Sequence, residues 1–247
     1  MLAFLRLTLL GLHCAFASAF GLLLTLCRPF HPDNSRLCAK LFAWPALRIM
    51  GLRMDIRIEA LLELKRPCVI IANHQSNYDL FVIGGLIPPR TVSMGKKSLK
   101  WLPLFGQLYW LAGNVLIDRD NPRNARRSLL ATARILQERD TSIFVFPEGT
   151  RHPGEGMLPF KKGAFQLALA AGVPIVPLCV SSYAGTLDAN RCVAARIAIR
   201  SLAPIETSSL TSADLGQLME DCRSRMHDCI RDLDAQLQAP VGEVEAL

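Results

Sequence analysis

Five consecutive apolar residues at positions 68–72, with the sequence CVIIA, constrain the fold of this chain more than any other feature. An unbroken apolar run of this length is typical of a strand covered on both faces, as in the centre of an α/β sheet. The polar segment NHQSNYD, residues 73–79, follows directly. Its residues Asn73, Ser76 and Asn77 favour a loop and a helix N-cap. We therefore expect a buried strand that ends in a polar turn and continues into a helix.

From about Met54 onward, short apolar segments alternate with helical patterns. Further strands are expected at residues 55–59, 91–94, 114–117, 142–146, 173–180 and 195–201, and helices at residues 122–139, 163–171 and 212–238. This alternation predicts one α/β domain, residues 54–240, with a central mixed sheet flanked by helices. Residues 1–53 are expected to precede it as a helical segment that anchors the protein to a membrane.

Residues 7–27 form an apolar run of 21 residues between Arg6 and Arg28, without Asp, Glu, Lys or Arg. About 20 apolar residues allow a helix to cross a bilayer, so this segment either spans the membrane or lies deep in one leaflet. A cleaved signal peptide is the alternative, because residues 15–17 (AFA) resemble a cleavage site. The apolar run continues for ten residues beyond that site, which favours retention of the segment.

Basic residues exceed acidic ones between positions 28 and 53, which predicts that the rest of the chain lies on the cytoplasmic side. Residues 36–53 interleave bases with apolar residues, and Pro45 lies where a helix would kink. An interfacial helix with its bases toward anionic lipid fits this pattern. A core helix of the α/β domain is the alternative interpretation.

The charge balance also indicates an anionic partner. Lys and Arg number 28 against 21 Asp and Glu, a net charge of +7, while 51% of the 247 residues are hydrophobic. Lipid headgroups, a phosphorylated substrate or an acidic carrier protein would each suit this charge. Nucleic acid is not expected, because no nucleic-acid-binding motif occurs and aromatic residues make up only 7% of the chain.

Neither a metal site nor an organic cofactor is indicated. The eight cysteines form no CxxC pair, and the simplest interpretation is reduced thiols facing the cytosol, without zinc or disulfides. No His/Asp cluster has the spacing of metal ligands, and the pair Gly84-Gly85 is too little for a dinucleotide-binding loop. GxSxG, a signature of serine hydrolases, is absent.

His74 and Asp79 form a candidate proton-handling pair. Positions five apart do not share a face of a continuous helix. They can meet only if His74 lies in the loop and Asp79 in the first helical turn. A histidine satisfied at an ordinary strand-to-helix turn is the alternative.

Two later blocks add groups suited to phosphate. Arg119, in GNVLIDR, follows a predicted strand, and Glu148-Gly149-Thr150-Arg151 follows another. Arginine can bind phosphate through two hydrogen bonds, and glycine permits close approach of the backbone. The alternative for the second block is a tight turn with a surface ion pair. Ligands of open α/β sheets gather at the carboxyl ends of strands, so both blocks are expected beside His74.

Together, the blocks NHQSNYD, GNVLIDR, FPEGTR and VPIVP, in this order, resemble the four blocks of the glycerolipid acyltransferase superfamily. The matching positions are His74, Asp79, Arg119, Glu148, Gly149, Arg151 and Pro177. The resemblance implies transfer of a fatty acyl chain from acyl-CoA or acyl-carrier protein to the sn-2 hydroxyl of lysophosphatidic acid, forming phosphatidic acid. It also implies a bacterial inner-membrane enzyme with its catalytic domain on the cytoplasmic side, and no cofactor beyond the acyl donor.

The resemblance assigns roles to residues as well. His74 would remove the proton of the acceptor hydroxyl, and Asp79 would fix the histidine tautomer and stabilise the imidazolium. The acceptor's glycerol phosphate would be held by Arg119, by the block from Glu148 to Arg151 and, as a weaker candidate, by Lys161. Three alternatives stay open at this point: a different lysolipid acceptor, a thioesterase or lipase in which His74 activates water, and a lipid-binding protein without catalysis.

Overall fold

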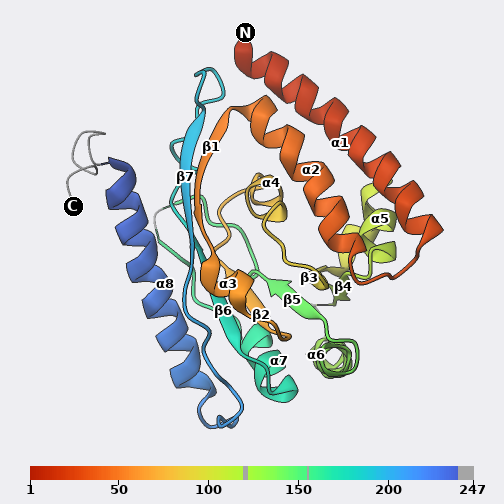
Figure 1. Cartoon of the computed structure of the whole chain (residues 1–247), viewed down its shortest axis with the longest axis vertical. Helices are drawn as coiled ribbons and strands as arrows, with labels where there is room; N and C mark the ends of the chain where they lie inside the picture. Colours follow the sequence, from red (N-terminus) through yellow and green to blue (C-terminus); the bar gives the residue numbers. More distant parts are fainter. Residues whose placement is uncertain (119–121, 155, 239–247) are drawn as a thin grey trace.

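A seven-stranded sheet forms the centre of the fold (Figure 1). Its strands are β1 (Leu52–Arg57), β2 (Val69–Ala72), β3 (Thr91–Lys96), β4 (Val115–Ile117), β5 (Ser142–Val145), β6 (Ile175–Val180) and β7 (Ala195–Ser201). Their spatial order is β1-β7-β6-β2-β5-β3-β4. Neighbouring strands are parallel except for β6 and β7, which are antiparallel. The predictions of a mixed α/β sheet and of a buried strand at residues 68–72 are confirmed, and that strand, β2, is the middle one of the seven.

Helices cover both faces of this sheet. They are α1 (Leu2–Cys27), α2 (Asn34–Met50), α3 (Glu59–Glu63), α4 (Asp79–Gly84), the 3-10 helix η1 (Lys97–Trp101), α5 (Phe105–Leu111), α6 (Pro122–Glu138), α7 (Gly163–Ala171) and α8 (Leu215–Gln238). Figure 1 shows α1 and α2 side by side, with α8 on the opposite side of the sheet. This computed structural model describes residues 1–118, 122–154 and 156–238, and only the backbone of residues 122–126.

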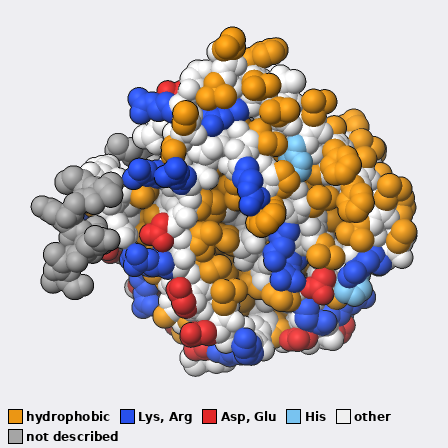
Figure 2. Space-filling model, turned by 45° about the horizontal axis from the view of Figure 1, so that its top comes forward, with side chains coloured by type: hydrophobic (Ala, Val, Ile, Leu, Met, Phe, Trp, Pro, Cys, Tyr) orange, Lys and Arg blue, Asp and Glu red, His pale blue; other side chains and the backbone are white. Residues whose placement is uncertain are grey.

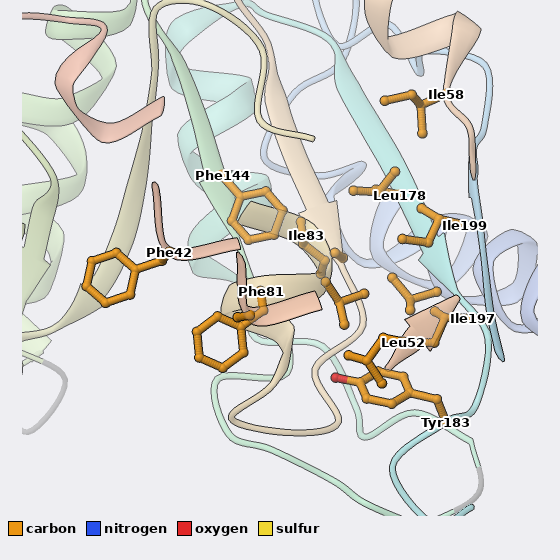
Figure 3. Packing of buried hydrophobic residues seen from close by; sticks show 14 of the residues in the cluster. Phe42, Leu52, Ile58, Phe81, Ile83, Phe144, Leu178, Tyr183, Ile197 and Ile199 are labelled. Carbon is orange, nitrogen blue, oxygen red and sulfur yellow. The ribbon is translucent and has the colours of Figure 1, made fainter. Parts of the chain in front are cut away.

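Strand β2 explains why the run at residues 68–72 has no polar member. Ile70 and Ala72 belong to the core beneath α1, α2, α4 and α5, part of which Figure 3 shows. Val69 and Ile71 belong to the core beneath α6, α7 and α8. Successive side chains of a strand point to opposite faces, so a strand between two helical layers must be apolar throughout.

Some element boundaries differ from the sequence-based expectation. Strand β1 begins at Leu52, because Gly51 ends α2 in a left-handed conformation with φ +67°. The strand stops at Arg57, and the short helix α3 takes up Glu59, which was expected to be in the strand. The expected helix at residues 163–171 is confirmed in full as α7.

Helix α2 packs into the core. Cys38, Phe42, Ala46 and Met50 lie on its buried side and join the same cluster as the sheet residues. Its outer side exposes Trp44, which is 67% exposed. This is the arrangement of a core helix, and the functional division of the chain at residue 53 stays a prediction.

Helix α1 has 26 residues and is the one helix in the described part of the chain that is long and apolar enough to cross a membrane. Most of its large apolar side chains face outward, among them Phe4, Leu12, Phe16 and Leu23. Figure 2 shows hydrophobic side chains gathered on the side of the molecule where α1 lies. An apolar surface of this extent indicates contact with a membrane or with another protein.

The packing of α2 predicts the effect of two substitutions in that helix. Met50→Ala should lower the free energy of unfolding by about 2 to 5 kcal/mol, because it leaves a cavity where a fully buried side chain was. Trp44→Ala, on the exposed side, should change it by about 0.5 kcal/mol or less. Denaturant unfolding in detergent measures both. Equal effects would contradict a core position for α2.

Candidate active site

The candidate site is a cavity of about 1030 Å³ at the carboxyl ends of β2, β3 and β5. One part of its lining is polar and includes His74, Asp79 and Arg151. Another part is apolar, with Phe42 from α2 and Leu108 from α5. The cavity can therefore accept a molecule with a charged end and a hydrocarbon chain.

His74 and Asp79 meet in the predicted manner. His74 leaves the end of β2, and Asp79 is the first residue of α4. The imidazole Nδ1 lies 2.7 Å from Asp79 Oδ2, and the Asp79 side chain is 1% exposed against 20% for His74. A carboxylate on Nδ1 holds the proton there, so Nε2 carries the lone pair and can act as a base.

The environment of Asp79 fixes this geometry further. Its Oδ2 also accepts hydrogen bonds from the backbone N–H groups of Gln75 (2.8 Å) and Ser76 (2.9 Å). The His74 ring stacks on Phe146, with ring centroids 3.8 Å apart at 13°. Phe146 follows β5, so the imidazole is held from two adjacent strands.

Glu148 joins the loops around the site. Its Oε1 accepts a hydrogen bond from the backbone N–H of His74 (2.8 Å), and its Oε2 accepts one from Leu158 (2.9 Å). The residue is 2% exposed, and burial raises the pKa of its carboxyl although both hydrogen bonds and the nearby His74 act to lower it. Glu148 thus places the backbone of His74, while a contact with substrate stays a prediction.

The glycine of this block is required by its surroundings. Gly149 has φ +72°, and a Cβ there would lie 2.9 Å from Nζ of Lys161. The Lys161 ammonium therefore lies against the backbone of Gly149, while binding of an anion by the two residues stays a prediction.

Arg151 and Thr150 line the same cavity and are exposed. The Arg151 guanidinium donates a hydrogen bond to Asn77 Oδ1, which ties it to the loop that carries His74. Of the predicted site residues, His74, Asp79, Gly149, Thr150, Arg151 and Lys161 line one cavity. Arg119 lies outside the described residues.

Sequence reasoning missed two residues that build the site. Asn73 joins β2 to β6 by donating to the Val180 carbonyl (2.8 Å) and accepting from the Val180 N–H (2.9 Å). Tyr183 donates its hydroxyl proton to Asp79 Oδ1 at 2.5 Å. No local pattern could have indicated Tyr183, because 104 residues separate it from Asp79.

A histidine oriented by a buried carboxylate, in a cavity with a cationic part and an apolar part, is an arrangement suited to proton removal from a hydroxyl group. The described residues contain no cluster of His, Cys, Asp or Glu suited to a metal ion.

Comparison with known proteins identifies the family. Residues 53–181 match the family model described as Acyltransferase. The chain is 38% identical over 237 residues to the 1-acyl-sn-glycerol-3-phosphate acyltransferases of Salmonella typhimurium and Escherichia coli, with 96% of each chain covered. It is 36% identical over 187 residues to human 1-acyl-sn-glycerol-3-phosphate acyltransferase alpha, covering 75% of this chain and 66% of the human one. The chain belongs to the 1-acyl-sn-glycerol-3-phosphate acyltransferase family.

A solved structure agrees on the fold. The crystal structure of the 1-acyl-sn-glycerophosphate (LPA) acyltransferase from Thermotoga maritima matches with a TM-score of 0.73 and 20% identity, covering 95% of both chains. Over 95% of its length, the chain therefore shares the fold of this solved structure.

Replacement of Glu148 tests its role in joining the loops. Glu148→Gln leaves one backbone N–H facing an amide NH₂, so the free energy of unfolding should fall by about 1 to 3 kcal/mol. Burial raises the pKa of Glu148 above 4.5, so its contribution to stability is lost as the pH rises through the raised pKa. The Glu148→Gln variant lacks the carboxyl group, so the difference in free energy of unfolding between wild type and variant should shrink as the pH rises from 4.5 to 7. Denaturant unfolding at several pH values measures this, and a deficit that grows with pH would contradict it.

Proposed function

We propose that the protein transfers a fatty acyl chain from a thioester donor to the sn-2 hydroxyl of 1-acyl-sn-glycerol-3-phosphate, forming phosphatidic acid for phospholipid synthesis. The observation that carries this proposal is the His74–Asp79 pair, 2.7 Å apart, in a cavity that is cationic in one part and apolar in another. The names of the relatives support the choice of acceptor.

The reaction follows from the orientation of the imidazole. His74 Nε2 takes the proton of the acceptor hydroxyl while that oxygen attacks the thioester carbonyl carbon. A C–O bond forms, the C–S bond breaks, and the proton on His74 passes to the departing thiolate or to solvent. Asp79 stabilises the imidazolium that exists between these steps. The acceptor hydroxyl is itself the nucleophile, so no acyl-enzyme forms.

The two parts of the cavity suit the two parts of the acceptor. Arg151 and Lys161, with the backbone at Gly149 and the Thr150 hydroxyl, present donors for the glycerol phosphate. We extend this role to Arg119 from the family resemblance alone. The apolar part of the lining, which includes Phe42 and Leu108, suits an acyl chain.

The donor is proposed to be acyl-CoA or acyl-carrier protein, used directly and without a cofactor or metal. A second hollow, of about 680 Å³, adjoins the first at Asn114, which lines both. Lys100 and Arg127 line the second hollow, together with Lys97, which forms an ion pair with Asp118 at 2.9 Å. Lys100 and Arg127 suit the phosphate that both donors carry at the end of the phosphopantetheine arm.

Helix α1 is proposed to lie in one leaflet of the bacterial inner membrane, with the domain on the cytoplasmic side. Both of its ends are bound to the same domain: Arg6 contacts the β6–β7 loop, and the turn after α1 is bound by a hydrogen bond from Phe30 N–H to the Leu111 carbonyl (2.8 Å). A helix held at both ends lies along the domain surface. Its exposed apolar side then faces acyl chains.

An assay that crosses donors with acceptors tests the function. Purified protein should form product from lysophosphatidic acid with acyl-CoA or acyl-carrier protein, and little from lysophospholipids with larger headgroups. Arg151→Ala should raise the KM for lysophosphatidic acid by about 10- to 100-fold through loss of a charge-assisted hydrogen bond, with a smaller change in kcat. Equal rates with all acceptors would point to another lysolipid. Fatty acid released equally fast without any acceptor would point to a thioesterase.

Removal of the base should abolish most of the turnover. His74→Ala is expected to lower kcat by about a thousandfold, the typical contribution of a general base. His227→Ala is the control, because His227 lies on α8 with a side chain that is 54% exposed. Phosphatidic acid formation measures both variants. Near-normal turnover of His74→Ala would refute the assignment.

The position of α1 can be tested by protease accessibility. A peptide tag before Met1 should be digested in inverted membrane vesicles and protected in intact spheroplasts, because both ends of α1 lie on the cytoplasmic side. A periplasmic protein serves as the control for spheroplast access. Digestion of the tag in spheroplasts would show that α1 crosses the bilayer.

A further inference from the structure

The loop between β6 and β7, residues 181–194, contacts the catalytic pair at one end and helix α1 at the other. At the first end, the Tyr183 side chain is fully buried and its hydroxyl lies 2.5 Å from Asp79 Oδ1. Asp79 Oδ2 is the oxygen that accepts from His74. Tyr183 therefore holds the second oxygen of the carboxylate that orients the base.

The position of Tyr183 is itself fixed. Its backbone N–H donates to Gln75 Oε1 (3.0 Å), and the Gln75 amide donates to the Ser181 carbonyl (2.9 Å). The ring belongs to the core cluster shown in Figure 3, in which Leu52 also lies. The lining of the catalytic cavity does not include Tyr183 among its described residues, so its effect on the reaction must pass through Asp79.

At the other end, Arg6 of α1 binds the loop through hydrogen bonds. Its guanidinium donates to the carbonyls of Ala189 (3.0 Å), Arg191 (2.5 Å) and Cys192 (2.9 Å), and the residue is 8% exposed. Because the N–H groups of a guanidinium are held in a rigid plane, three hydrogen bonds to it fix the loop carbonyls relative to α1.

Two further contacts close this end of the loop. The Ala3 N–H donates to Asn190 Oδ1 (3.1 Å), and the Ala194 N–H donates to the Gly51 carbonyl (2.9 Å). A Cβ on Gly51 would lie 2.4 Å from Arg6 Nη2, so only glycine leaves room for the guanidinium.

We propose that Tyr183 is a positioning residue for Asp79. We also propose that α1, through Arg6, holds in place the β6–β7 loop that carries Tyr183. The apolar helix thus does more than cover the domain: its first turns keep the catalytic carboxylate in place. This inference rests on the proposed acyl transfer in one respect: kcat for phosphatidic acid formation is used to detect changes in the geometry of the His74–Asp79 pair.

The physical reason is the burial of Asp79. Loss of the tyrosine hydroxyl leaves Oδ1 without its donor inside the protein, where an unpaired charged acceptor is costly. The carboxylate then moves toward other donors, and the imidazole moves with it. A shift of this kind affects proton removal in the transition state and leaves binding of the acceptor unchanged.

Tyr183→Phe tests the first link. It keeps the ring and removes the hydroxyl, so kcat should fall by about tenfold or more while the KM for lysophosphatidic acid stays within about twofold. The NMR signal of the His74 Nδ1 proton, assigned with His74→Ala, should shift. The control is Thr207→Val, which removes a buried hydroxyl bonded to the Val173 carbonyl at 2.8 Å, and it should change neither readout. Unchanged kcat and an unchanged signal in Tyr183→Phe would overturn the proposal.

A double-mutant cycle tests the second link. Arg6→Ala should lower kcat in the wild-type background and have little further effect in Tyr183→Phe, because both act through one hydroxyl. Arg6→Lys should recover only part of the loss, since an ammonium cannot reach three carbonyls. Arg48→Ala is the control for loss of a cation from the N-terminal helices, because the Arg48 guanidinium lies 4.1 Å from the centroid of the Trp44 ring.

The outcomes separate this inference from the proposed function. If the wild-type protein forms no phosphatidic acid, the proposed function fails, and the shift of the His74 signal in Tyr183→Phe and Arg6→Ala still decides the inference. If the wild type is active and Arg6→Ala lowers kcat by the same factor in both backgrounds, α1 does not act through Tyr183 and the second link is overturned.

Discussion

The buried Asp79 carboxylate is the interaction on which the site depends. A carboxylate that is 1% exposed persists inside a protein only where hydrogen bonds replace its water. Four donors do so here: the His74 imidazole, two N–H groups of the turn after β2, and the Tyr183 hydroxyl. The imidazole, the turn and the β6–β7 loop are thereby positioned by one group. Glu148 adds a second buried carboxylate, which fixes the backbone of His74 from the β5 side.

The fold supplies this arrangement because β2 is buried on both faces. Helices α1, α2, α4 and α5 cover one face and α6, α7 and α8 the other, so the polar turn at the end of β2 lines a cavity together with apolar residues of α1, α2, α4 and α5. Leu10 of α1, Phe42 of α2 and Leu108 of α5 line the apolar part of this cavity. The same helix that exposes an apolar surface also binds the loop of Tyr183 through Arg6.

Local patterns were enough to predict β2, α7 and the meeting of His74 with Asp79, since each depends on a short stretch of sequence. The five-residue helix α3 left no periodic signal, and Glu59 was therefore predicted to be in a strand. The buried position of Glu148 could not be read from its neighbours, because its partner Leu158 lies ten residues away in an irregular loop. Tyr183 and Arg6 act across 104 and more than 180 residues, distances over which only the folded chain brings them together.

In the proposed reaction His74 acts on the acceptor hydroxyl, and the acyl chain passes directly from donor to acceptor. Rapid-quench kinetics with a radiolabelled acyl thioester distinguishes direct transfer from an acyl-enzyme. With direct transfer, protein mixed with donor alone carries no covalent label, and label appears in phosphatidic acid without a lag once acceptor is present. A burst of acyl-enzyme, formed before acceptor is added and consumed by it, would contradict direct transfer.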